Sequence, residues 1–180
     1  MTVTPTSLPD VLLIERRVFG DARGGFVEAW NAERYREAGI AETFVQDNVS
    51  YSKHGVLRGL HLQRALHAQG KLVSVLQGEV FDVAVDVRPD SATFGKWIGE
   101  TLSAENGRQL YIPPGFAHGF VVTHQDAIFA YKCTEVYAPH AEVSLRWDDP
   151  EIGIAWPVRD PKLSQKDRAA QELSAVVDQL

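Results

Sequence analysis

The stretch Val80-Phe81-Asp82-Val83-Ala84-Val85-Asp86-Val87 decides the fold of this chain. Large apolar residues recur at every second position, and acidic or small residues stand between them. Such a period of two is typical of a β-strand with one buried face. Residues 72–76 have the same strand character and are separated from this stretch by Gln77-Gly78. We therefore expect a hairpin-like pair of strands here.

Further short, strand-like segments lie on both sides of this pair, and turn clusters separate them. The segments are residues 11–19, 26–30, 44–49, 97–102, 110–112, 119–123 and 128–137. The clearest turn clusters are Arg88-Pro89-Asp90-Ser91 and Pro113-Pro114-Gly115. Short strands divided by Gly and Pro turns favour an all-β sandwich or barrel over alternating strands and helices.

Two helices are expected beside the strands. Asn31 is a suitable N-cap for a helix over residues 32–38, and Gly39 would end it. Residues 164–180 form the longest helical pattern. Ser164 and Asp167 stand in capping-box positions there, with Asp in place of the usual Glu. We therefore expect one C-terminal helix.

Composition limits the class of protein. A chain of 180 residues fits a single domain spanning 1–180. The net charge of −6 and the absence of a long basic run argue against nucleic-acid binding. Cys133 is the only cysteine, which excludes an internal disulfide and a Cys-based metal site and favours a reducing cytoplasm. No signal peptide or membrane-spanning run is visible.

Two neighbouring segments, Arg58-Gly59-Leu60-His61-Leu62-Gln63 and Gly70-Lys71-Leu72-Val73, carry the most chemistry. They place a base, a permanent cation and an amine close together, a set suited to removing a proton and holding the resulting anion. The residues alone leave other interpretations open. His61 could be a structural, buried histidine, and Lys71 could face solvent at the start of a strand. Arg58 and His61 have opposite parity on a regular strand, so both can face one cavity only if the chain is irregular near Gly59.

Taken together, the segments resemble the dTDP-4-dehydrorhamnose 3,5-epimerase family, whose members are cupin-type jelly rolls. The resemblance covers about residues 19–167, in order. It rests on residues 21–28, 44–48, 55–61, 69–73, 113–120, 131–134, 147–150, 154–157 and 163–167. It implies an all-β jelly-roll barrel with a few short helices. It also implies an enzyme that inverts carbons beside the ketone of a nucleotide-linked sugar without a cofactor or a metal.

The resemblance implies four catalytic residues. His61 would be the base, and Lys71 would stabilise the enolate oxygen. Tyr131 would be the acid on the opposite face of the sugar, although by pattern alone it reads as a core tyrosine. Asp167 would orient His61, although its place in the helix cap is sufficient to explain it. The two roles of Asp167 would coexist only if its side chain reached away from its own cap.

The resemblance also implies residues that bind a dTDP-4-keto-6-deoxyhexose. These are Arg23, Phe26, Glu28, Gln46, Asn48, Arg58, His118 and Glu142. Arg23 and Arg58 would meet the diphosphate, and Phe26 would stack on the thymine. His118 would lie near the sugar or its phosphates, or otherwise at a surface turn. A homodimer is expected, with Arg23, Phe26 and Glu28 reaching the partner's site.

A metal-dependent cupin site is not expected, because no His-x-His occurs and the next histidine after His61 is His67, in an expected loop. The chain departs from the family pattern at Val49, Leu62, residues 64–68 and residues 168–170. These changes surround the site but remove none of its catalytic groups. They leave three functions open: an epimerase acting at C3 and C5, a single-site epimerase or ketoisomerase on a related sugar nucleotide, and a cupin that only binds its ligand.

Overall fold

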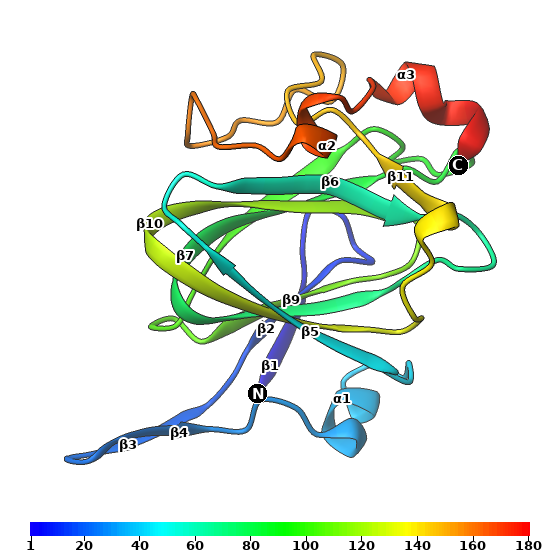
Figure 1. The fold of residues 1–180 in the computed structure, drawn as a ribbon. Helices are drawn as coiled ribbons and strands as arrows, with labels where there is room; N and C mark the ends of the chain where they lie inside the picture. Colours follow the sequence, from blue (N-terminus) through cyan, green and yellow to red (C-terminus); the bar gives the residue numbers. More distant parts are fainter.

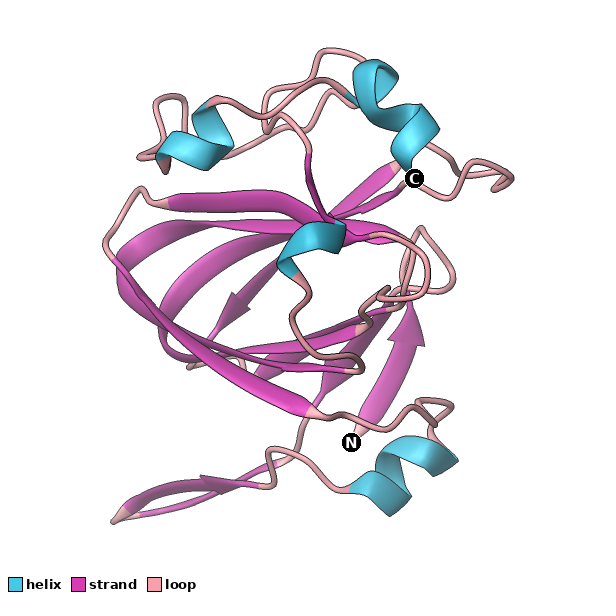
Figure 2. Cartoon of the chain, turned by 45° about the vertical axis from the view of Figure 1, so that its right-hand side comes forward, coloured by secondary structure: helices cyan, strands magenta, loops and turns pink.

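The computed structural model describes residues 1–180, which fold mainly into β-strands (Figures 1 and 2). One sheet has the order β1-β2-β9-β7-β10-β6-β11, with β5 added to β10 and β8 added to β7, and β3 and β4 form a separate hairpin. The strands are β1 (Thr2–Pro5), β2 (Leu12–Glu15), β3 (Val18–Asp21), β4 (Gly24–Val27), β5 (Gln46–Ser52), β6 (Leu57–Gln63), β7 (Lys71–Asp86), β8 (Trp97–Ser103), β9 (Arg108–Ile112), β10 (Phe116–Cys133) and β11 (Glu142–Ser144). The expected all-β jelly roll is confirmed.

The helices are short and lie outside the sheet. They are α1 (Ala32–Glu37), α2 (Gln165–Arg168) and α3 (Leu173–Val176), together with the 3₁₀ turns η1 (Pro139–Ala141) and η2 (Val177–Gln179). Asn31 caps α1 as expected, because its side chain accepts hydrogen bonds from the backbone of Glu33 and Arg34. None of the helices is long and apolar enough to cross a membrane.

The expected hairpin at Gln77-Gly78 is wrong, because residues 71–86 form one continuous strand, β7. Gly78 has a φ of +76°, and an added Cβ would lie 2.5 Å from the carbonyl oxygen of Asp126 on β10. The partner strand β10 shifts its register at the same place, between Val122 and Ile128. The glycine therefore marks a bend where two paired strands curve together, and not a chain reversal.

The irregularity expected near Gly59 is confirmed. Gly59 has a φ of +128°, and the β6–β10 register shifts opposite it, between His118 and Phe120. A Cβ on Gly59 would lie 2.5 Å from the Cα of Gly119, so the two backbones approach too closely for any other residue. This bulge allows Arg58 and His61 to line the same cavity despite their parity.

Two apolar clusters lie on opposite faces of β7, so the expectation of a single buried face is wrong. Val80 and Ala84 belong to the cluster inside the barrel, together with Phe116, Phe120 and Phe129 of β10. Val83 and Val85 belong to an outer cluster, which the C-terminal segment covers through Leu173 and Val176. Inward-facing positions of β7 and β10 therefore supply both the barrel core and the walls of the cavity described below.

The single C-terminal helix expected over residues 164–180 is also wrong. The backbone of Gln171 bonds to that of Arg146 and forms a bridge with Leu145, which interrupts the helix after α2. The buried Asp149 carboxylate then accepts a hydrogen bond of 2.6 Å from the backbone of Leu173, where α3 begins. Tertiary bonds thus override a favourable local pattern. Residues 11–19, expected as one strand, are likewise divided between β2 and β3 in two different sheets.

Candidate active site

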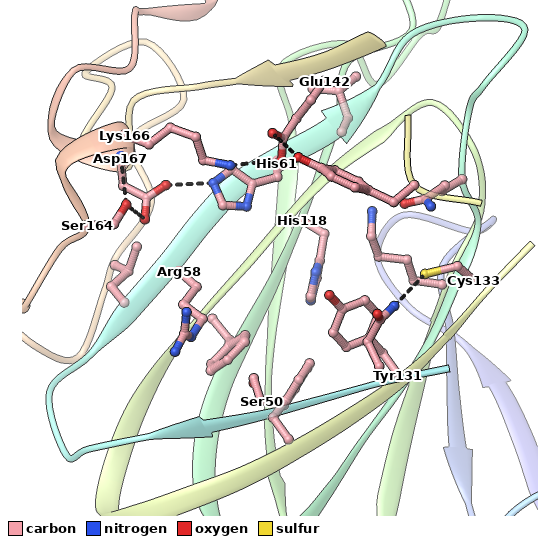
Figure 3. A pocket seen from close by; sticks show the side chains of 18 of the residues that line it. Ser50, Arg58, His61, His118, Tyr131, Cys133, Glu142, Ser164, Lys166 and Asp167 are labelled. Carbon is pink, nitrogen blue, oxygen red and sulfur yellow. Dashed lines mark hydrogen bonds and ion pairs between the residues drawn. The ribbon is translucent and has the colours of Figure 1, made fainter. Parts of the chain in front are cut away.

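A pocket of about 840 Å³ lies between the inner faces of β5, β6, β7 and β10, and residues 162–167 close one side of it (Figure 3). Most of the residues named from the sequence line it together. They are Gln46, Asn48, Arg58, His61, Lys71, His118, Tyr131, Glu142 and Asp167. The sequence therefore predicted most of one real cavity, from segments as distant along the chain as β5 and α2.

His61 is held by a carboxylate. Its Nε2 atom lies 2.6 Å from Oδ1 of the buried Asp167. The second oxygen, Oδ2, accepts a hydrogen bond of 2.7 Å from the hydroxyl of Ser164. Burial opposes ionisation of Asp167, but the hydrogen bonds from His61 and Ser164 outweigh it, so its pKa lies below the usual value. An ionised Asp167 favours the proton of His61 on Nε2 and leaves Nδ1 free to accept one.

Asp167 therefore orients His61 and also belongs to the cap of α2. Its backbone N–H donates to the Ser164 hydroxyl at 3.1 Å, the ordinary capping bond. The expectation that the two roles require the side chain to reach away from the cap is wrong. The carboxylate has two oxygens, and it directs one to Ser164 and the other to His61.

Lys71 begins β7 and is only 7% exposed, so its amine lies inside the molecule at the pocket wall. This settles its position in favour of the cavity. It forms no salt bridge with any carboxylate of the chain. Burial lowers its pKa, although Cys133, Glu142 and Asp82 act in the opposite direction. A buried cation without a paired carboxylate is costly to the fold, and it is suited to meeting a negative charge that arrives with a ligand.

His118 is not at a surface turn. It is buried on β10, next to His61 on the neighbouring strand β6. Its Nε2 atom lies 2.9 Å from Oδ2 of Asp82, which is fully buried on β7. Oδ1 of Asp82 has no partner. Burial raises the pKa of Asp82, against the opposing effects of His118 and Lys71. A second His–Asp pair thus lies deeper in the barrel than the first.

Tyr131 lies across the pocket from the His61–Asp167 pair, with His118 between them in the view of Figure 3. It is half-buried and packs against the barrel core beside Phe129. Burial is the main cause that raises its pKa. The ring packs on the core, as the pattern predicted, and it also lines the cavity. At neutral pH the hydroxyl keeps its proton and can donate it.

Glu142 lies at the rim of the pocket on β11. Its carboxylate accepts hydrogen bonds of 2.9 Å from the Lys166 amine and 3.1 Å from the Tyr137 hydroxyl. Burial opposes its ionisation, but these bonds and the charge of Lys166 bring its pKa below the usual value. Arg58 points its guanidinium to the same pocket and is fixed by the Ser52 hydroxyl at 3.0 Å. The rim therefore combines two cations held by hydrogen bonds, Lys166 and Arg58, with the carboxylate of Glu142.

Three of the expected binding residues lie elsewhere. Arg23 and Phe26 are exposed on the β3–β4 hairpin, which projects away from the barrel in Figure 1. Arg23 pairs with Asp21 at 2.6 Å, and Glu28 pairs with Arg34 at 3.1 Å near α1. None of the three lines the pocket of its own chain.

Other pocket residues were not identified from the sequence as part of the site. They are Ser50, Gln63, Gln69, Cys133, Tyr137 and Lys166, with Asp82 behind the wall. Asp82 was missed because the alternation placed it on the face opposite Val83 and Val85, whereas in the structure it shares the inner face of β7 with Val80 and Ala84. Tyr137 carried no signal, because its irregular segment has no periodicity that would aim a side chain. Lys166 carried none either, because the four-residue helix α2 is too short for a periodic pattern.

The arrangement suits the inversion of a carbon beside a carbonyl. It offers a carboxylate-oriented imidazole, a hydroxyl from another strand that can donate a proton, and a buried amine in the wall of the same pocket. Removing a weakly acidic C–H proton requires both a positioned base and a cation or donor for the enolate oxygen. Adding a proton to the opposite face requires a second group on the other side of the cavity.

Comparisons with known proteins agree with this geometry. The sequence profile of the family described as dTDP-4-dehydrorhamnose 3,5-epimerase matches residues 5–175. A protein of that name from Salmonella typhimurium is 57% identical over 94% of each chain, and one from Pseudomonas aeruginosa is 57% identical over 93% of each. The crystal structure of a dTDP-6-deoxy-D-glucose-3,5-epimerase from Legionella pneumophila, in complex with dTDP-4-keto-L-rhamnose, is 51% identical with a TM-score of 0.96. It covers 99% of this chain and 96% of that chain.

The buried amine of Lys71 should lower the stability of the fold. Lys71→Met should raise the free energy of unfolding at pH 7 by about 1–2 kcal/mol, because it replaces a buried, unpaired cation with an apolar side chain of similar length. Folding lowers the pKa of Lys71, so the wild type gains stability as pH rises between its folded pKa and the unfolded value of about 10.4. The advantage of the variant should therefore shrink at alkaline pH.

Urea denaturation at pH 7 and at a higher pH measures both effects. Lys132→Met is the matched control, because Lys132 lies on the adjacent strand β10 but is paired with Asp47 at 2.9 Å. It should give no gain. A Lys71→Met protein that is less stable than wild type at pH 7 would contradict this interpretation of the buried amine.

Proposed function

The chain belongs to the dTDP-4-dehydrorhamnose 3,5-epimerase family, and we propose that it inverts C3 and C5 of dTDP-4-keto-6-deoxy-D-glucose to give dTDP-4-keto-L-rhamnose. The observation that carries the proposal is the pocket in which the His61–Asp167 pair faces Tyr131, with Lys71 in the wall. The whole chain, residues 1–180, acts as one epimerase domain in this account.

Nδ1 of His61 removes the proton from the carbon beside the 4-keto group. The C–H bond breaks, its electrons pass into the enolate, and the negative charge develops on the carbonyl oxygen. Asp167 holds the other ring nitrogen and stabilises the imidazolium that forms. Lys71 faces the enolate oxygen from the wall, where its buried charge has no competing carboxylate bond.

Tyr131 then donates its hydroxyl proton to the same carbon from the opposite face, which inverts the centre. Its raised pKa keeps the hydroxyl protonated until that step. Solvent returns a proton to the tyrosinate and removes one from the imidazolium, and the cycle repeats at the second carbon. His118, held by Asp82, contributes a hydrogen bond to the sugar, and Arg58 meets the diphosphate.

The nucleotide end of the substrate requires residues beyond this pocket. Arg23 and Phe26 are exposed, Glu28 is half-buried, and all three lie outside the pocket of their own chain, so we assign them to the thymidine end of the partner's site in a homodimer. Exposed Val49 and Tyr51 on the outer face of β5 offer apolar surface for the pairing of two sheets. Light scattering that gives a monomer at micromolar concentration would contradict the dimer.

The other two functions considered from the sequence are less well supported. The most similar relatives reported above carry the name of 3,5-epimerases, which favours action at both carbons over a single-site enzyme. A module that only binds would have no need of a carboxylate-oriented base opposite a proton donor. The free thiol of Cys133 fits the proposed cytoplasmic location.

His61→Asn should lower kcat by about 10²–10⁴-fold, because a positioned base contributes that much to proton abstraction. Binding of the sugar nucleotide, measured by titration calorimetry, should change far less, since the rim and the hairpin remain intact. His124→Asn is the control, because His124 is exposed on β10 and lies outside the pocket. Normal turnover by His61→Asn would contradict the proposal.

Tyr131→Phe should separate proton exchange from inversion. The variant keeps the His61–Asp167 base, so protons beside the ketone should still exchange with solvent deuterium, while the yield of inverted product falls steeply. NMR of the sugar ring after incubation in D₂O reads both outcomes at once. A Tyr131→Phe protein that inverts at the wild-type rate would show that another group is the acid.

A further inference from the structure

Two histidines outside the pocket meet closely at its rim. His67 lies in the loop between β6 and β7, and His140 lies in η1. Their Nε2 atoms are 3.3 Å apart. Neither residue lines the pocket, and the mechanism above uses neither.

The backbone on both sides of this pair is fixed. The amide of the buried Gln63 bridges the two segments, since its Nε2 donates to the carbonyl of His67 at 2.7 Å and its Oε1 accepts from the backbone of Ala138 at 2.7 Å. The guanidinium of Arg64 donates to the carbonyl of His140 at 2.6 Å. These backbone hydrogen bonds hold the two imidazoles close together. The contact between the rings is not needed to keep them there.

The rings do not meet head to head. Their planes are at 86°, and their centroids are 4.9 Å apart. The contact is a hydrogen bond between the two Nε2 atoms, in which either ring can be the donor. A cation bound by both nitrogens would take the place of the proton that they share.

Zinc–imidazole bonds are roughly 2.0–2.1 Å long, and at a tetrahedral angle two such ligands stand about 3.3–3.4 Å apart. The observed separation of 3.3 Å matches that bite. Neutral imidazole is a good ligand for Zn²⁺, Ni²⁺ and Cu²⁺. His140 is exposed and His67 half-buried, so water has room to complete the coordination shell.

We propose that His67 and His140 form a two-histidine binding site for a divalent transition-metal ion at the rim of the pocket. No group of three or more His, Cys, Asp or Glu side chains supports it, so the ion keeps several water ligands and exchanges readily. The ion takes no part in proton transfer. It ties the loop at residues 64–68 to η1, and through Gln63 it stiffens one wall of the pocket.

Calorimetric titration of the full chain with Zn²⁺ tests the proposal. Wild type should bind one ion per chain at this site, and His67→Gln and His140→Gln should each weaken that binding by at least about tenfold, because each removes one of two protein ligands. The exposed His124→Gln is the matched control and should bind as wild type does. Both test variants replace side chains outside the pocket, and their turnover in the presence of a chelator should equal that of wild type.

Two further readouts distinguish this pair from other sites. At ten times Kd, Zn²⁺ should raise the melting temperature of wild type by about 3 °C or more, and this rise should disappear in His140→Gln. The electron paramagnetic resonance spectrum of bound Cu²⁺ should show two nitrogen ligands in wild type and one in either variant. Zn²⁺ binding that survives both substitutions, or no binding up to about 1 mM free ion, would overturn the proposal.

Discussion

Strands β7 and β10 pair from Lys71 opposite Cys133 to Asp86 opposite Phe116, and nearly every feature of the site depends on this pairing. Period two sends alternate side chains of both strands inward, and the irregularity at Gly78 changes which parity faces the barrel. Lys71 before it and Val80 and Asp82 after it therefore all face the interior. The bend at Gly78 curves the pair enough to enclose a cavity. A shift of one residue in this register would turn these polar groups outward and the core with them.

The interior of this barrel is more highly charged than stability alone would favour. Lys71, Asp82 and Asp167 are all buried, and Oδ1 of Asp82 has no partner. Buried ionic groups are kept only where they are hydrogen-bonded or where function requires them. Each His–Asp pair fixes the orientation of one imidazole, and the buried amine of Lys71 has no paired carboxylate. In the proposed reaction, these groups would be in place before any ligand arrives, which is the condition for electrostatic catalysis.

The class of fold and many of the residues that line the pocket could be predicted from the sequence, because they follow from local patterns. The predictions that were wrong concern features that tertiary contacts decide. Alternation along residues 80–87 and the parity conflict between Arg58 and His61 are local properties, and the strand and the irregularity that they predicted were confirmed. The single buried face expected for that strand was wrong, because the C-terminal segment covers its other face. The hairpin at Gln77-Gly78 and the long helix over residues 164–180 were wrong, because a bend shared with β10 and the backbone bonds of Gln171 are tertiary effects. Asp82, Tyr137 and Lys166 entered the site by folding alone, without a sequence signal of their own.

The measurement that tests the central claim most directly is solvent exchange by the wild-type protein. The protein is incubated with dTDP-4-keto-6-deoxy-D-glucose in D₂O, and C3 and C5 of the sugar are followed by NMR. Our account predicts deuterium at both carbons, together with the inverted L-sugar. Deuterium at one carbon alone would establish a single-site enzyme instead. No exchange, with binding confirmed by titration, would contradict the claim that the His61–Asp167 pair acts as a base on this sugar.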